Sequence, residues 1–393
     1  MIVRQFLHWV RTAPAGERAE ATSALARAYL YSDLGPDDRA AAEGAMLMLL
    51  DDASPLVRRA LAEALASSRA APPTVIQALA TDQPDVAVVV VERSPLFIDA
   101  DLVDLVATGA PAVRAAVARR VPVQCAVAAA IAEVGSAEAC LTLIENPEAE
   151  IAQFSIDRVV ERFGHLAAIR EALFSFPDLP APTRQALVLR LSATLADFVA
   201  ARAWLGAERA HRIAQEACEK ATVVLAAESP ADETGPLIRH LCASGQLTAG
   251  LILRALLSGN IDLFEQALAE LSGMPLTRVR SFVHDHRGAG LRALFDKAGL
   301  PASTWPAFRA AVEAMRETGF QAEASGASRL RRRMVERVLT GCEKAEIGEV
   351  EPLLTLLRRF TTEAAREEAR RYCEELVAED ALTFDPEQER VAA

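Results

Sequence analysis

Short runs of apolar residues recur along the first half of the chain at the spacing of a buried helix face. After Val57, apolar side chains follow at positions 60, 61, 64 and 65, which is the i, i+3, i+4, i+7, i+8 pattern of an amphipathic helix. After Ile151 the same positions are only half apolar. The pattern predicts short helices, each with one face turned towards a core.

A turn motif precedes these apolar runs and occurs four times. Its fullest form is Asp52-Ala-Ser-Pro-Leu-Val-Arg58, and looser copies begin at Asp82, Gly109 and Asn146. Each copy places a turn-forming residue before a proline and a β-branched apolar residue, which is typical of a helix that begins with proline. We therefore expect each copy to open a helix.

The spacing of the motifs gives the size of the repeating unit. Their apolar anchors are separated by 29, 27 and 38 positions, at Val57, Val86, Val113 and Ile151. This period holds two short helices and two turns, so each unit is predicted to be a helical hairpin. The Asp-x-x-x-x-Val-Arg signature resembles HEAT-like repeats, whose usual period of about 40 to 47 residues is longer. We predict an all-α fold, an α-solenoid-like array of short HEAT-like helical hairpins with a C-terminal helical extension.

Helix start and stop signals continue through the second half. Proline-rich breaks at 177–183 and 229–236 are typical of joints between subdomains. The stretch 247–257 is predicted to be a helix, and the Asp-x-x-Glu spacing from Asp262 predicts a capping box for the next helix. Residues 319–328 are small and polar, which is typical of a flexible linker.

These signals divide the chain into six predicted segments. They are N-terminal helices at 1–40, HEAT-like repeats at 41–176, a second helical-hairpin region at 177–318, the linker at 319–328, a C-terminal helical pair at 329–382 and a frayed tail at 383–393. The terminal pair carries an apolar stripe at Leu353, Leu356, Leu357 and Phe360. Glu363 and Arg366 are at pairing distance on its solvent face. Self-association into a homo-oligomer through the stripe is an alternative that stays open.

Composition and charge limit the fold classes and functions that the chain can have. The hydrophobic content of 51% is carried mainly by Ala, Leu and Val, a mixture that favours closely packed helices. The net charge of −12 disfavours a nucleic-acid or anionic-membrane binder, because such proteins need a positive field. The six cysteines are scattered and have no zinc-site spacing. Neither a signal peptide nor an apolar run of about 20 residues is evident, so a cytoplasmic location is expected.

Arginines are the candidate interaction residues. Arg58 and Arg114 occupy equivalent motif positions, and the favoured interpretation is an ion pair with an acidic turn residue of a neighbouring unit, such as Asp52 or Asp82. The other interpretation is an anion site on a concave face. Two further basic segments are candidates for binding, the first to an acidic protein partner or nucleic acid, although a solvated helix face is the default interpretation of both. They contain Arg278, Arg280, Arg287 and Arg292 in one and Arg331, Arg332 and Arg333 in the other.

Recognised chemical motifs are missing from the sequence. His284-Asp285-His286 is the densest group of metal-ligand types, but i and i+2 side chains diverge on a helix and no third ligand lies at a suitable spacing. There is no Gly-rich phosphate loop, nucleophile elbow or His-Glu-x-x-His motif. We therefore expect no metal, no cofactor and no enzymatic activity.

Two blocks of the sequence resemble a known family. The first block combines Asp52–Ala66, Val75–Asp82 and Arg93–Leu102, and the second combines Gly259–Leu268, Gly288–Phe295 and Ala298–Pro301. Together they are similar to an alphaproteobacterial family catalogued as a domain of unknown function, family number 2336. The resemblance implies a bacterial, intracellular, helical protein and carries over no catalytic residues.

The leading functional hypothesis is a non-enzymatic helical-repeat scaffold that binds a protein partner, in bacterial regulation or signalling. Stacked hairpins expose long surfaces for such contacts without needing any chemistry. The alternative is a HEAT-like nucleic-acid-binding protein or base-processing enzyme. That alternative requires a continuous positive groove and binding that weakens steeply with salt.

Overall fold

The computed structural model describes residues 8–10, 12–176, 178–285, 289–318, 335–336, 338 and 351–383. Throughout these ranges the regular elements are helices, accompanied by one isolated β-bridge between Val123 and Ala149. The predicted all-α class is therefore confirmed. The chain divides into two compact units, Met1–Leu179 and Pro180–Ala393.

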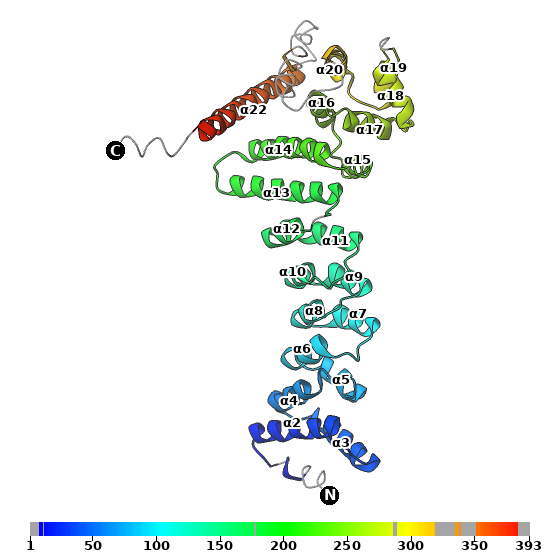
Figure 1. The fold of residues 1–393 in the computed structure, drawn as a ribbon, viewed down its shortest axis with the longest axis vertical. Helices are drawn as coiled ribbons and strands as arrows, with labels where there is room; N and C mark the ends of the chain where they lie inside the picture. The colour runs from blue at the N-terminus through cyan, green and yellow to red at the C-terminus, as the bar shows by residue number, and fades with distance from the viewer. Residues whose placement is uncertain are drawn as a thin grey trace, which may run out of the picture. The chain divides into compact units, whose positions relative to one another are not determined.

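The first unit is a stack of short helices in two layers (Figure 1). In chain order the helices are α2 (Ala15–Tyr31), α3 (Pro36–Leu49), α4 (Pro55–Leu65), α5 (Pro73–Ala80), α6 (Pro84–Arg93), α7 (Asp99–Thr108), α8 (Pro111–Ala118), α9 (Cys125–Val134), α10 (Ala137–Glu145), α11 (Gln153–Phe163) and α12 (Ala167–Phe174). Each helix of the series α2, α4, α6, α8, α10 and α12 packs on the next, and α7, α9 and α11 do the same in the second layer. This is the solenoid-like arrangement that the repeats predict.

Proline and one apolar face define many of these helices. Helices α3, α4, α5, α6 and α8 each begin with a proline, at a position where no N–H is needed for intrahelical bonding. The anchors Val57, Val86 and Val113 are buried, as predicted. On α4, Leu61 and Leu65 are completely buried on the same side, and such a side chain stabilises the fold by about 1.5–3 kcal/mol.

The fourth copy of the motif does not open a helix, so this part of the prediction is wrong. Between Asn146 and Ala152 the chain forms a turn and then the β-bridge to Val123. Val123 exchanges two backbone hydrogen bonds with this segment, which keeps the chain out of helical geometry. Helix α11 consequently begins at Gln153, and the predicted anchor Ile151 precedes it.

Arginines link successive units of the stack, and we call these links the arginine ladder. Arg18 donates to both carboxylate oxygens of Asp52, at 2.9 and 2.8 Å. Arg58 donates in the same way to Asp82, at 2.6 and 3.0 Å, and its third nitrogen donates to the Asp52 carbonyl at 2.5 Å. Arg114 instead donates to carbonyl oxygens at the ends of α7 and α9. The ion-pair interpretation is therefore confirmed for Arg58 and wrong for Arg114.

The second unit begins with a long helical hairpin and continues with shorter helices. It contains α13 (Ala181–Ala201), α14 (Ala207–Glu228), α15 (Thr234–Ala243), α16 (Ala249–Leu257), α17 (Ile261–Ser272), α18 (Leu276–His284), α19 (Ala289–Lys297), the 3₁₀ helix η1 (Ala302–Thr304), α20 (Trp305–Thr318) and α22 (Glu351–Thr383). Helix α13 packs along α14, α14 on α16, and α16 on both α17 and α20. Phe264 of α17 and Phe308 of α20 stack in the core, with ring centroids 6.1 Å apart.

The predicted capping box of α17 is wrong. Asn260, rather than a residue further along, caps the helix, because its side chain accepts a first-turn backbone N–H at 3.0 Å. Glu265 is freed from that role and is 3% exposed. Its carboxylate accepts a hydrogen bond from Arg280 Nε at 2.9 Å and lies 3.0 Å from His284 Nε2.

Helix α22 belongs to the second unit. Its Leu357 and Phe360 are buried in the core of that unit, so the predicted self-association seam packs against the chain itself at these two positions. The side chains of Leu353 and Leu356 lie outside the described residues. Glu363 does not pair with Arg366 as the sequence suggests, since its carboxylate binds a guanidinium of α16.

Some predicted boundaries fall elsewhere in the structure. Helix α3 spans the boundary expected at residue 40, since its first turn is set by Pro36. The predicted linker at 319–328 lies outside the described residues, as does most of the first half of the predicted terminal pair. Among the helices that the structure describes, none combines the length and apolar character needed to cross a bilayer.

Candidate functional site

A tight turn closes the α13–α14 hairpin. His211 Nε2 lies 3.6 Å from Asp197 Oδ1, which places the two helices in antiparallel register near the turn. Ala203 adopts a left-handed conformation with φ of 55°, and the backbone N–H of Trp204 donates to the Val199 carbonyl at 3.2 Å. This local geometry holds Trp204 at the end of the hairpin.

Large apolar side chains are exposed at this end. Trp204 is 65% exposed and Phe198 is 45% exposed. Their rings meet edge to face with centroids 5.9 Å apart, and the Arg202 guanidinium lies 3.8 Å from the Phe198 ring centroid. Leu195 and Ile213 are also exposed, and the helix register puts them at the same level of the hairpin. We call Leu195, Phe198, Trp204 and Ile213 the hairpin-end cluster.

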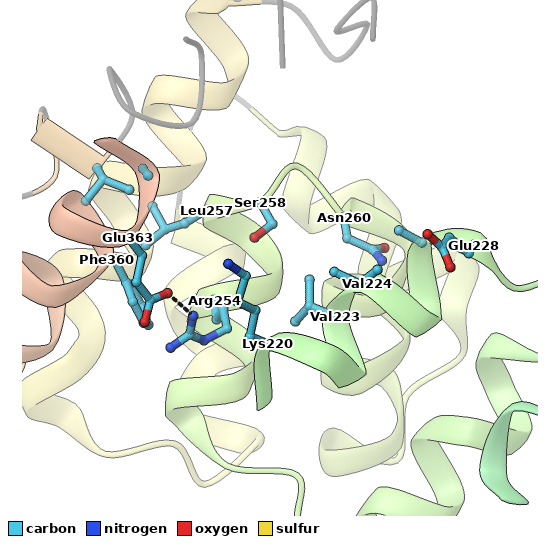
Figure 2. Close-up of a pocket in the computed structure, with 13 residues that line it drawn as sticks. Lys220, Val223, Val224, Glu228, Arg254, Leu257, Ser258, Asn260, Phe360 and Glu363 are labelled. Carbon is cyan, nitrogen blue, oxygen red and sulfur yellow. Dashed lines mark hydrogen bonds and ion pairs between the residues drawn. The ribbon is translucent and has the colours of Figure 1, made fainter. Parts of the chain in front are cut away.

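A buried arginine joins α22 to the rest of the second unit. Arg254 of α16 is 6% exposed, and its Nη1 donates to Glu363 Oε2 at 2.6 Å (Figure 2). Its guanidinium also lies 4.2 Å from the centroid of the Phe360 ring. A buried charge is strongly destabilising without such partners, so these contacts fix the position of α22. We call Arg254, Phe360 and Glu363 the α22 clasp.

Glu219 of α14 completes the surroundings of Arg254. Its Oε2 lies 3.9 Å from Arg254 Nε, and its Oε1 accepts a hydrogen bond from the Thr248 hydroxyl at 3.2 Å. Burial raises the pKa of Glu219 above its usual value, and the Arg254 charge and the Thr248 hydroxyl offset part of that rise. The Glu219 carboxylate is therefore stabilised by contacts with Arg254 and Thr248 rather than by water.

A small cavity of about 250 Å³ adjoins the α22 clasp. Figure 2 shows the clasp at one side of it, Lys220 and Ser258 near its middle, and Asn260 on the other side. Valines of α14 and the Phe360 ring supply apolar walls. Ligand pockets typically measure about 300–1,000 Å³, so this one is suited at most to a small molecule.

The predicted arginines that the structure describes are divided between the two units. Arg58 and Arg114 lie in the first unit and donate to acceptors of the chain itself. Arg280 is occupied by Asp262 and Glu265. These guanidinium groups therefore stabilise helix packing.

The other predicted arginines lie at the surface or outside the described residues. Arg292 pairs with Asp296 at 3.1 Å, and its guanidinium lies 5.0 Å from the Trp305 ring centroid. Arg278 is exposed and lies 5.7 Å from the Phe282 ring centroid. Arg287, Arg331, Arg332 and Arg333 lie outside the described residues. In the described part of the chain, no group of three His, Cys, Asp or Glu side chains is placed to hold a metal ion.

The hairpin-end cluster and the α22 clasp were not anticipated as sites, although each has a sequence signal. Trp204 lies in the turn between two long helices, and such connecting segments run over the protein surface. Arg254 is the one charged residue in the otherwise apolar helix α16, which is typical of a buried ion pair. Its partner Glu363 is 109 residues away, so the sequence around Arg254 does not identify it.

Comparison with known proteins gives one match. The model of a family described as an uncharacterised protein conserved in bacteria (DUF2336) matches residues 86–348, which is more than half of the chain. The match includes the α13–α14 hairpin and Arg254, and it ends before α22. Neither a curated protein nor a solved structure matches the chain.

Proposed function

The chain belongs to the uncharacterised bacterial family DUF2336, and from this premise we propose that it is a non-enzymatic helical-repeat scaffold that binds a protein partner. The proposed contact surface is the hairpin-end cluster. We further propose a cytoplasmic role in bacterial regulation or signalling. Among the described residues, five cysteines are present as free thiols, which suits a reducing compartment.

The exposure of the hairpin-end cluster is the observation that carries this proposal. Four large apolar side chains at one end of a hairpin are exposed by 45% to 65%. Contiguous exposed apolar surface commonly marks a site of protein contact. Trp and Arg are also the residue types enriched among those that dominate binding energy, and here Arg202 lies against Phe198 and Trp204.

The arginines of the first unit support the proposal because they bind acceptors within the stack. The guanidinium groups of the arginine ladder donate to carboxylates and carbonyls within the stack. They therefore hold the units together and are not presented as a row of cations for phosphates. A stack whose units are linked by internal contacts of this kind is what a scaffold needs.

The proposal is tested by capture of the tagged full-length protein from the bacterium that encodes it, with and without nuclease. The Trp204→Ala variant is compared with Tyr31→Ala, which removes an aromatic ring that is 79% exposed in the first unit. We expect a nuclease-resistant protein to co-purify with the wild type and with Tyr31→Ala. The amount recovered with Trp204→Ala should fall at least about tenfold, because interface anchors of this kind contribute about 2 kcal/mol or more.

Two outcomes contradict the proposal. One is recovery of nucleic acid alone, with no protein that resists nuclease treatment. The other is a protein whose recovery is the same from both variants. Circular dichroism of the purified variants checks that each remains folded.

A further inference from the structure

A second hollow of the second unit lies between α14 and α22 and is lined mainly by arginines. It has a volume of about 660 Å³. Arg209 and Arg212 come from α14, and Arg358, Arg359 and Arg366 come from α22. We call this hollow the arginine groove. No sequence motif marks it, because the two arginine rows are about 150 positions apart.

Both acidic residues of the groove lining form ion pairs with arginines of the chain. The groove lining includes two glutamates, Glu216 and Glu363. Glu216 pairs with Arg359, and Glu363 belongs to the α22 clasp. In the part of the chain that the structure describes, Arg209, Arg212 and Arg366 have no ion-pair partner. With both glutamates paired, the guanidinium groups of Arg209, Arg212 and Arg366 leave the groove positively charged.

The charge of the groove is positive, whereas the net charge of the whole chain is negative. The net charge of the chain is −12, so an extended polyanion is repelled by most of its surface. A short anionic segment that fits within the groove experiences the local positive charge instead. At physiological salt, screening limits the reach of surface charges to about 8–10 Å. A short anionic segment in the groove is therefore affected mainly by the nearby positive charges and little by the negative charges on the rest of the chain.

The length of the groove also favours a short ligand. Its lining extends along α22 from Thr355 to Arg366, which is about 16 Å at about 1.5 Å per residue. That length matches about three turns of helix. It is less than half of the roughly 34 Å that separates successive major-groove half-sites on a DNA duplex.

We propose that the arginine groove binds a short acidic segment of the protein partner, through ion pairs between arginines and carboxylates. This inference rests on the proposed scaffold function and specifies the chemistry of the partner. Ile213 belongs both to the groove and to the hairpin-end cluster, so the two surfaces are continuous. Guanidinium groups bind carboxylates with two parallel hydrogen bonds, which gives such a contact both direction and strength.

The test measures binding of a fluorescein-labelled oligoglutamate peptide of about 12 residues, which spans about 18 Å as a helix. Fluorescence anisotropy is recorded with the full-length protein at low salt. We expect saturable binding that weakens at least about tenfold in Arg212→Glu and in Arg366→Glu, because each variant replaces an attraction with a repulsion. Both side chains are exposed, so the fold is expected to tolerate the changes.

Arg69→Glu is the matched control. Arg69 is an exposed arginine of the first unit, and its replacement changes the net charge by the same amount. Equal loss of peptide binding in the control would show a general charge effect and overturn the proposal. So would equal or tighter binding of a labelled oligothymidylate of about the same charge, or no peptide binding by the wild type.

The scaffold function and the acidic-partner proposal fail in different ways. If Trp204→Ala abolishes partner capture while Arg212→Glu and Arg366→Glu retain it, the partner is real and the acidic-segment proposal is wrong. If all three variants lose the captured protein, both proposals are supported.

Discussion

The guanidinium group of Arg58 joins α4 to the turn between α5 and α6 through Asp82, which is 24 residues away in sequence. The two side chains are 15% and 14% exposed, so the pair is largely withdrawn from water. We expect Arg58→Met to lower the free energy of unfolding by about 2 kcal/mol, because it leaves a charged carboxylate without its partner. Urea unfolding monitored by circular dichroism measures this value.

The neighbouring residue Arg59 provides the matched control. It pairs with Glu63 along the same helix, and both side chains are about half exposed, at 53% and 52%. Arg59→Met should change the unfolding free energy by less than about 0.5 kcal/mol, since exposed pairs contribute little. Equal losses in the two variants would contradict the structural role of the arginine ladder.

The Asp82 carboxylate makes the free energy of unfolding depend on pH. Burial alone would raise the pKa of Asp82, but hydrogen bonds from Arg58 and from the Gln83 backbone outweigh burial and hold it below its usual value. A lowered pKa contributes stability above pH of about 4, and that contribution is lost as the pH falls through the folded-state value. Asp82→Asn should therefore lose less stability than the wild type between pH of about 4 and 2. Urea titrations at several pH values test this, and identical slopes would refute it.

The backbone of Ala203 predicts a substitution that increases stability, unlike those above. A non-glycine residue with φ of 55° carries strain, because the side chain crowds the following carbonyl. Ala203→Gly should raise the free energy of unfolding by up to about 1 kcal/mol, since glycine adopts this conformation without that penalty. Thermal unfolding measures the change. A lower midpoint than the wild type would contradict the geometry of the hairpin turn.

At the residue scale, the sequence predicts an ion pair where the next copy of the motif opens with an aspartate. Arg58 pairs with the aspartate that opens the following motif, and Arg18 pairs in the same way with Asp52. The motif after Arg114 opens with Asn146, which offers no carboxylate, and Arg114 turns to backbone carbonyls. The identity of one residue in the next motif therefore decides which kind of contact forms.

Helix α22 depends on the clasp. Glu363→Ala would leave Arg254 buried beside Phe360 without its closest carboxylate. We expect the backbone amides of α22 to exchange with deuterium at least about tenfold faster, since local opening follows local stability. Glu374→Ala, an exposed change on the same helix, should leave exchange unaltered. Unchanged exchange in Glu363→Ala would show that the clasp does not fix α22.

At the element scale, helices were predictable and their distant partners were not. Prolines, apolar faces and caps are local features, so they identify most helices of the first unit. The extended segment before α11 depends on hydrogen bonds to Val123, which is far outside any local window. The i, i+3 spacing predicts Arg366 as the partner of Glu363, but Arg254 of another helix binds this carboxylate instead.

Over the whole molecule, the sequence predicts a helical repeat protein but not the surfaces on which its function depends. Repetition and composition are properties of the entire chain, and they determine the class. The arginine groove and the hairpin-end cluster arise from side chains that tertiary packing leaves exposed. A surface of this kind has no required sequence pattern, so the structure is needed to reveal it.

Site-specific photo-crosslinking in the living bacterium tests the central claim most directly. A photoreactive residue is placed at Ala201, an exposed position beside the hairpin-end cluster, or at Tyr31 in the first unit. The scaffold account predicts one discrete protein adduct from position 201 that resists nuclease, disappears in the Trp204→Ala background and is absent from position 31. An adduct to nucleic acid, equal adducts from both positions, or none from position 201 would contradict it.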